Sequence, residues 1–226
     1  MNKTNVVVCL FMLLAVTDVF ALEPPKLPLG FFVTSSGLGK GANLGGLAGA
    51  DAHCQQLAKE AGWGGRSWHA YLSIQAEGNK PAINARDRIG KGPWANAKGV
   101  VIAEDLAHLH GDKVALVQLE NNVNRLTTLT EKGELIKGSG DTINQHDIIT
   151  GTLYDGKAYN DGFDHTCQSY TSSAEGRVQM GHSDHSNHGV VGGNLSWNST
   201  HASRGCSPES LKITNGVGYF YCFAAN

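Results

Sequence analysis

A short histidine-rich segment is the part of the sequence best suited to hold a metal ion. Three histidines recur at every third position of residues 181–188: His182, His185 and His188. Asp184 lies among them. Imidazole nitrogen is a good ligand for zinc, copper or nickel. The segment therefore predicts a zinc or copper site, which His165 and His201 could join after folding. The alternative interpretation is a solvated polar loop that happens to contain histidines.

A second stretch has the composition of a recognition surface. It combines one tryptophan with hydroxyl, amide and imidazole groups: Trp197, Asn198, Ser199, His201 and Ser203. An aromatic ring among such polar groups can bind a ligand, and Asp184 would add a carboxylate nearby. The alternative is that Trp197 packs beneath the loop as a core anchor.

No arrangement in the sequence is typical of a catalytic site. A Gly-x-Ser-x-Gly sequence around a nucleophilic serine does not occur. Asp155, Asp161 and Asp164 lie among glycine and asparagine without the residue order of a calcium loop, so they are better interpreted as turn-forming residues. We therefore expect a binding protein and not an enzyme.

The amino-terminal residues have the pattern of an export signal. Lys3 precedes an apolar run over residues 6–16, and Ala21 places a small residue at the expected cleavage site. We expect three segments: a signal peptide over 1–21, an extended leader over 22–29 and a single domain over 30–226. The run is too short to span a bilayer, so we expect a secreted or periplasmic protein without membrane insertion. A net charge of −2 argues against nucleic acid as a partner.

The elements that must position these residues are short. Cys54, Leu57, Ala58 and Ala61 recur at helical spacing and predict a helix over 51–61, which Asp51 would favour at its beginning. Apolar and β-branched runs predict strands over 30–34, 67–73, 148–152 and 218–223, and a strand running into a short helix over 100–110. Residues 154–210 are expected to be mostly loop. This order predicts an α+β fold with mixed or antiparallel sheets and a loop-rich lobe.

Four cysteines remain after the predicted signal peptide: Cys54, Cys167, Cys206 and Cys222. An even number in an exported protein indicates two disulfides. Four cysteines allow three pairings, and the sequence alone leaves all three open.

Several motifs distributed over residues 30–224 form a common pattern. Gly-Ala-Asp-Ala-His-Cys begins at residue 49, Trp-His-Ala-Tyr-Leu-Ser at 68, Thr-Cys-Gln-Ser-Tyr-Thr at 166, Ser-Arg-Gly-Cys at 203 and Gly-Tyr-Phe-Tyr-Cys at 218. Together they resemble the endostatin-like branch of the C-type-lectin-like fold, as found in secreted and surface proteins of bacteria. The resemblance implies nested disulfides, Cys54–Cys222 and Cys167–Cys206. It also implies an adhesin-type lectin function, in which a glycan or an extracellular matrix protein is bound.

The resemblance does not extend to the family's known ligand sites. Residues 197–199 read Trp-Asn-Ser, where sugar-binding C-type lectins have Trp-Asn-Asp. Calcium prefers six to eight oxygen ligands, and this segment supplies few, so calcium is not expected. Two hypotheses follow. The first is an exported module that recognises a glycan or protein through residues 155–205. The second is an extracytoplasmic metal-binding protein that uses His182, His185 and His188.

Overall fold

The computed structural model describes residues 26–112, 121–184 and 196–225. The predicted signal peptide lies outside these residues. Among the helices within them, none is long and apolar enough to cross a membrane. The elements in chain order are β1 (Phe31–Val33), α1 (Gly46–Glu60), β2 (Trp68–Ala70), α2 (Ala85–Arg88), β3 (Trp94–Ala95), β4 (Val101–Ala103), α3 (Leu106–His110), β5 (Asp147–Ile149), α4 (Cys167–Tyr170), β6 (Gln179–His182), β7 (His201–Ala202), α5 (Pro208–Lys212) and β8 (Gly216–Ala224).

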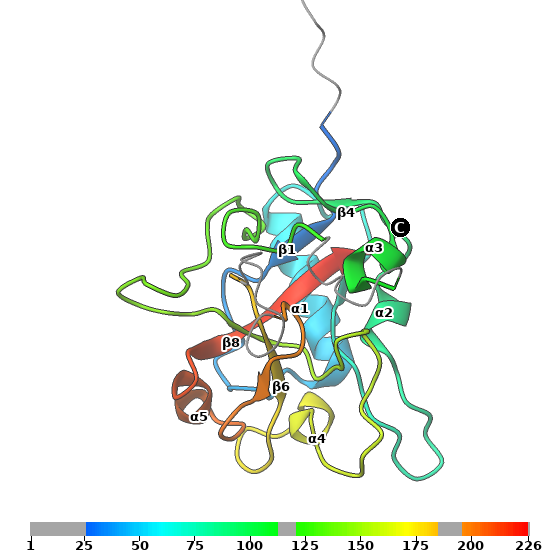
Figure 1. Cartoon of the computed structure of the whole chain (residues 1–226), viewed down its shortest axis with the longest axis vertical. Coiled ribbons are helices and arrows are strands. Elements are labelled where there is room, and N and C mark those ends of the chain that lie inside the picture. Colours follow the sequence, from blue (N-terminus) through cyan, green and yellow to red (C-terminus); the bar gives the residue numbers. More distant parts are fainter. Residues whose placement is uncertain (1–25, 113–120, 185–195, 226) are drawn as a thin grey trace, which may run out of the picture.

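A mixed sheet built around β8 organises the molecule (Figure 1). Its strand order is β1-β8-β5-β6-β7, and β2 also pairs with β8. The β5–β8 pair is parallel, whereas the other pairs of this sheet are antiparallel. The α+β class is thereby confirmed. The order also places β5, β6 and β7 side by side, with β7 at the end of the path.

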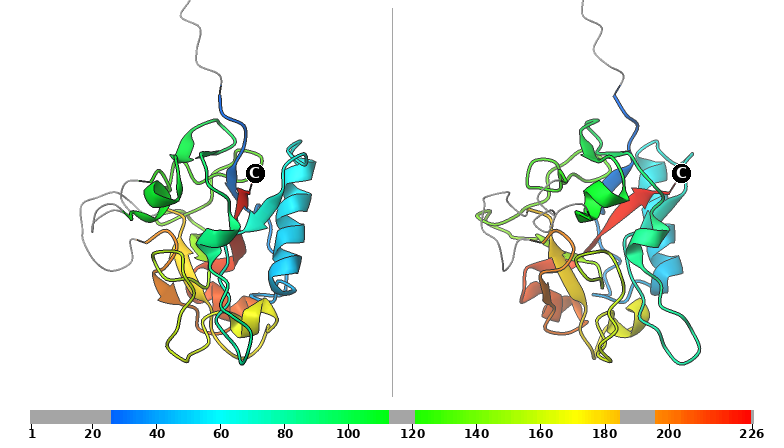
Figure 2. Two further views of the ribbon diagram at one scale, coloured as in Figure 1. Left: turned by 90° about the vertical axis from the view of Figure 1, so that its right-hand side faces the viewer. Right: turned by 45° about the vertical axis from the view of Figure 1, so that its right-hand side comes forward.

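The two faces of the sheet bury different cores because successive side chains of a strand point to opposite faces. Phe32 and Cys222 pack in the core that contains α1, whereas Phe31 and Phe223 pack in the core that contains Trp94. Figure 2 shows α1 along one side of the sheet and the segments around β4 and α3 on the other. The sheet is therefore covered on both faces.

The main helix begins earlier than the sequence pattern predicts. It starts at Gly46, after Gly45 in the left-handed conformation with φ 73°. Asp51 consequently lies inside the helix and not at its beginning. Its carboxylate accepts hydrogen bonds from the Ala70 amide at 2.8 Å and from Arg88 at 2.6 Å. Asp51 therefore joins α1 to β2 instead of capping the helix.

Two nested disulfides join distant parts of the chain. Cys54 of α1 is bonded to Cys222 of β8, and Cys167 is bonded to Cys206. The pairing expected from the resemblance is confirmed. The first disulfide links the helix to the central strand, and the second closes the late part of the chain.

The segment labelled α4 is a left-handed turn and not a right-handed helix. Cys167, Gln168, Ser169 and Tyr170 have φ values of 49°, 54°, 56° and 63°. This conformation costs roughly 1–2 kcal/mol per residue other than glycine. The disulfide at Cys167 offsets the cost, together with the Tyr170 hydroxyl, which donates to the Ser73 carbonyl at 2.7 Å.

Candidate metal centre

Three adjacent strands place one carboxylate and two imidazoles on the same face of the sheet. Asp147 of β5 is directly opposite His182 of β6 in the antiparallel register. His201 of β7 is opposite Met180, two residues before His182. Directly opposite residues share a face, and residues two apart in a strand do too. His146 precedes β5, and its ring stacks on that of His182 with centroids 4.2 Å apart.

The ring nitrogens of the three histidines surround the carboxylate of Asp147. Asp147 Oδ1 lies 3.2 Å from His182 Nε2 and 3.4 Å from His146 Nε2. Asp147 Oδ2 lies 3.5 Å from His201 Nε2. The Nε2 atoms of His182 and His201 are 3.1 Å apart. Ligands held about 2.0–2.1 Å from a tetrahedral zinc ion lie roughly 3.3 Å from one another. Each of the four distances is close to this spacing, with Oδ1 of Asp147 facing His146 and His182 and Oδ2 facing His201.

Asp147 is buried without hydrogen bonds to either of its oxygens. The residue is 0% exposed, and neither Oδ1 nor Oδ2 has a partner of acceptable hydrogen-bond geometry in the described parts of the chain. A buried ionised carboxylate is costly unless it is paired or coordinates a metal. The imidazoles are near enough to share a cation with Asp147 but are not aligned to donate to it. A metal ion among them would satisfy all these groups at once.

The electrostatics of the cluster favour an ionised Asp147. Burial acts to raise the pKa of Asp147, but the neighbouring His182 and His201 outweigh it, so the pKa lies below its usual value. Reciprocally, the carboxylate of Asp147 raises the pKa of His201 above its usual value. The side chain of His201 is 30% exposed, whereas those of His146 and His182 are 11% and 8% exposed. The centre therefore lies just beneath the surface and opens on the His201 side.

Contacts on the far side of two rings leave their Nε2 atoms available as ligands. His146 Nδ1 lies 2.8 Å from Asp184 Oδ1, and His201 Nδ1 lies 3.3 Å from the Ala202 carbonyl oxygen. Because both partners only accept hydrogen bonds when Asp184 is ionised, Nδ1 must carry the proton in each. Nε2 then presents a lone pair to the cluster in the neutral ring.

The donor set fits zinc or copper better than calcium. His146, Asp147 and His182 offer ligand atoms that all lie within 4.8 Å of one another, and His201 borders Asp147 and His182. Three imidazoles and one carboxylate suit zinc, copper or nickel, whereas calcium requires more oxygen ligands.

The cluster contains only part of the predicted histidine site. His182 and His201 are both in it, but His185 and His188 lie outside the described residues. His165 does not join, because its ring stacks on Tyr159 with centroids 3.7 Å apart and its Nε2 lies 2.8 Å from Asp161.

Sequence reasoning missed His146 and Asp147, which supply two of the four groups. The signal was present as a His-Asp pair immediately before a predicted strand. Nothing in the sequence shows that this strand lies next to β6.

The predicted recognition surface around Trp197 is mostly interior. Trp197 and Asn198 are each 0% exposed. The Trp197 ring packs 4.8 Å from that of Tyr71, and the Asn198 side-chain amide donates to the Tyr71 hydroxyl at 2.9 Å. Ser203 is also buried, and its hydroxyl accepts from the Val178 amide at 3.0 Å. Trp197 is therefore a core anchor, and it is not an exposed platform for a ligand.

Of the two serines in the predicted surface, Ser199 and Ser203, only Ser199 is partly accessible. Its Oγ lies 3.3 Å from the Tyr159 hydroxyl and accepts from Gln179 Nε2 at 3.3 Å. Tyr159 in turn borders a groove of about 1030 Å³ between residues 74–83 and residues 159–176. Phe163, which is 62% exposed, and Gln168 of the left-handed turn also line this groove.

A serine near the cluster lacks the geometry of a nucleophile. Ser139 Oγ lies 3.2 Å from His146 Nδ1, but Asp184 Oδ1 occupies the same nitrogen at 2.8 Å. A general base must be free to accept the proton of the serine. The proton that Nδ1 donates to Asp184 prevents this, so the contact does not activate Ser139.

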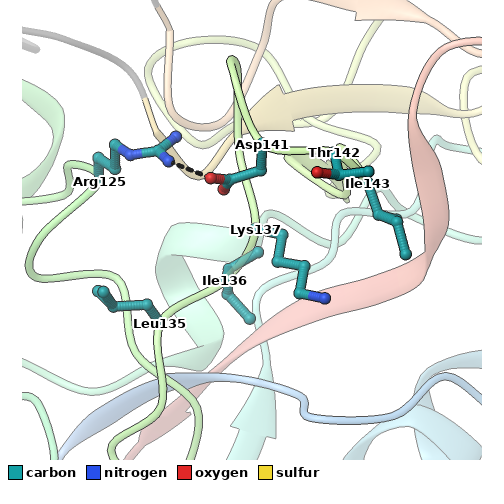
Figure 3. A pocket seen from close by; sticks show the side chains of 7 residues that line it. All are labelled: Arg125, Leu135, Ile136, Lys137, Asp141, Thr142 and Ile143. Atoms are coloured by element: carbon teal, nitrogen blue, oxygen red, sulfur yellow. Dashed lines mark hydrogen bonds and ion pairs between the residues drawn. The ribbon is translucent and has the colours of Figure 1, made fainter.

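A pocket is lined in part by Asp141, which belongs to the turn whose Ser139 amide donates to Asp184. Its volume is about 460 Å³, and the Arg125–Asp141 ion pair forms part of its wall (Figure 3). Ile136 and Lys137 also line it.

Comparisons with known proteins do not identify the chain. No protein-family model matches it, and no curated protein matches it significantly. The interpretation of the cluster therefore depends on its geometry and chemistry.

Proposed function

We propose that this protein is an exported metal-binding protein that holds zinc or copper through His146, Asp147, His182 and His201. The observation that carries the proposal is the convergence of three imidazoles, at distances of 3.2–3.5 Å, on a buried carboxylate that has no hydrogen-bond partner among the described residues. Two disulfides support export, because such bonds persist mainly in oxidising compartments.

The test is metal binding by the oxidised chain from residue 22 to residue 226. Calorimetric titration and elemental analysis should give one zinc or copper ion per chain and no calcium. The variant His182→Gln should lose this ion. His53→Gln is the matched control, because His53 contacts the Ser36 carbonyl away from the cluster and its removal leaves all four ligands in place.

A double variant separates this centre from the histidine-rich loop. His185→Gln with His188→Gln removes two predicted ligands that the structure does not describe. We expect this variant to keep the ion. Loss of the ion in the double variant, with full retention in His182→Gln, would refute the proposed centre and favour the loop.

We also propose, as a second candidate function, recognition of a glycan or extracellular protein. It is supported by the groove beside Tyr159, where exposed Phe163 lies among polar groups. The nested disulfides support the endostatin-like and C-type-lectin-like fold that the resemblance implies. The groove replaces the buried Trp197 as the expected contact surface.

A binding screen tests this second function. The mature protein is applied to a glycan array and to a panel of extracellular matrix proteins, with and without chelator. Phe163→Ala should weaken a true contact, whereas Leu126→Ala, which removes another exposed apolar side chain that does not line the groove, should not. Absence of binding to every member of both panels would refute recognition of these ligand classes.

A further inference from the structure

Two carboxylates face the two ring nitrogens of His146. Asp184 Oδ1 lies 2.8 Å from Nδ1, and Asp147 Oδ1 lies 3.4 Å from Nε2. A neutral imidazole carries a single proton, which can be donated to only one of them. The carboxylate that receives this proton determines whether the other nitrogen can bind a metal.

Asp184 has the better geometry to receive the proton. Its contact with the ring is within ordinary hydrogen-bond distance, whereas the Asp147 contact is longer than such bonds normally are. Asp184 is also fixed in place, because its Oδ2 accepts from the Ser139 amide at 2.6 Å. The proton of neutral His146 therefore lies on Nδ1.

We infer that Asp184 is a positioning residue of the metal centre, which holds the His146 proton on Nδ1 and so presents Nε2 as an unprotonated ligand. The inference rests on the proposed metal-binding function. Without Asp184, the remaining carboxylate of Asp147 would attract the proton to Nε2. A metal ion would then have to displace that proton before His146 could bind it.

The chain supplies a matched control for this role. Asp141 and Asp184 hold the same turn from two sides: Asp141 Oδ2 accepts from the Gly138 amide at 2.7 Å, and Asp184 Oδ2 accepts from the adjacent Ser139 amide. Asp141 is further paired with Arg125 (Figure 3). Of these two aspartates, only Asp184 also contacts His146. A purely structural role in the turn would thus be shared by both aspartates.

The experiment compares Asp184→Asn with Asp141→Asn in the full mature protein. Zinc affinity is measured by competition with a chromophoric chelator. Loss of an outer hydrogen-bond partner of a ligand typically weakens metal binding 10–100-fold, and we expect that loss for Asp184→Asn. We expect Asp141→Asn to stay within about twofold of the unmodified protein, since its contacts do not reach a ligand.

A spectroscopic readout follows the proton directly. Long-range ¹H–¹⁵N spectra of histidine rings, recorded without metal at a pH where the ring is neutral, distinguish Nδ1–H from Nε2–H. The signal that disappears in the variant His146→Gln is thereby assigned to the ring of His146. We expect Nδ1–H in the unmodified protein and in Asp141→Asn, and a shift towards Nε2–H in Asp184→Asn.

The outcomes separate this inference from the function on which it rests. If the unmodified protein binds no zinc, the proposed function fails and the inference fails with it. If it binds zinc but Asp184→Asn binds as tightly, only the inference is overturned. Equal losses in the two variants, with the proton of His146 unmoved, would also overturn it by showing a structural role in the turn.

Discussion

Saturation with zinc should stabilise the folded protein measurably. The four ligand groups come from β5, β6, β7 and the residue before β5, so they converge only in the folded chain. An ion that binds only the folded state stabilises it by about 2.7 kcal/mol when its free concentration is 100 times the dissociation constant. For a chain of 226 residues, each kcal/mol raises the melting temperature by about 2–4 °C. The expected rise is therefore about 5–11 °C.

The assay is thermal unfolding followed by circular dichroism, with zinc and with excess chelator. Asp147→Asn keeps the size of the side chain but removes the charge at the centre of the cluster, so the zinc-dependent rise should disappear. His53→Gln should retain it in full, because that ring lies outside the cluster. An equal rise in Asp147→Asn and in the unmodified protein would show that zinc binds elsewhere, and the interpretation of the cluster would be refuted.

Three further predictions concern the scaffold. Burial lowers the pKa of His110 to about 4, whereas an unfolded histidine titrates near 6.5. As the pH falls, the unfolded state therefore binds the proton first. About 3 kcal/mol in the free energy of unfolding should be lost between pH 6.5 and pH 4. Urea unfolding across this range should show the loss, and His110→Gln should reduce it. Replacing Cys167 and Cys206 with alanine opens a loop of 39 residues and should cost about 4 kcal/mol in the free energy of unfolding. Trp197→Ala should cost about 3–5 kcal/mol; a loss below 1 kcal/mol would contradict its place in the core.

The fold could be predicted from the sequence where local patterns are strong. The helix over 51–61 and the strand over 218–223 correspond to α1 and β8, which the structure extends by a few residues. The strand and short helix over 100–110 correspond to β4 and α3. The β6 strand was missed within the expected loop, because Gly181 and His182 do not favour strands. Its pairing with β5 and β7 forms it instead, and pairing between distant segments leaves no local pattern.

The candidate site was predictable only in part, for a related reason. Imidazole chemistry identified His182 from the sequence and named His201 as a residue that could join it after folding, but the actual set of partners depends on strand order. His146 and Asp147 are 36 and 35 positions earlier, and His201 is 19 positions later. Spacing within one segment cannot reveal a site that three strands assemble. The same limit explains Trp197, because its burial against the ring of Tyr71 depends on packing between segments that are distant in the sequence.

The late part of the chain explains why a metal ion would matter to this fold. β7 has two residues and lies at the end of the strand order, so backbone pairing alone holds it weakly. The Cys167–Cys206 disulfide fixes the chain five residues after His201 but does not reach β5. A metal ion bound by Asp147, His182 and His201 would join β5, β6 and β7 through their side chains. The ion would then add a link that the disulfide does not supply, and its release would loosen β7, the end of the sheet through which the centre is exposed.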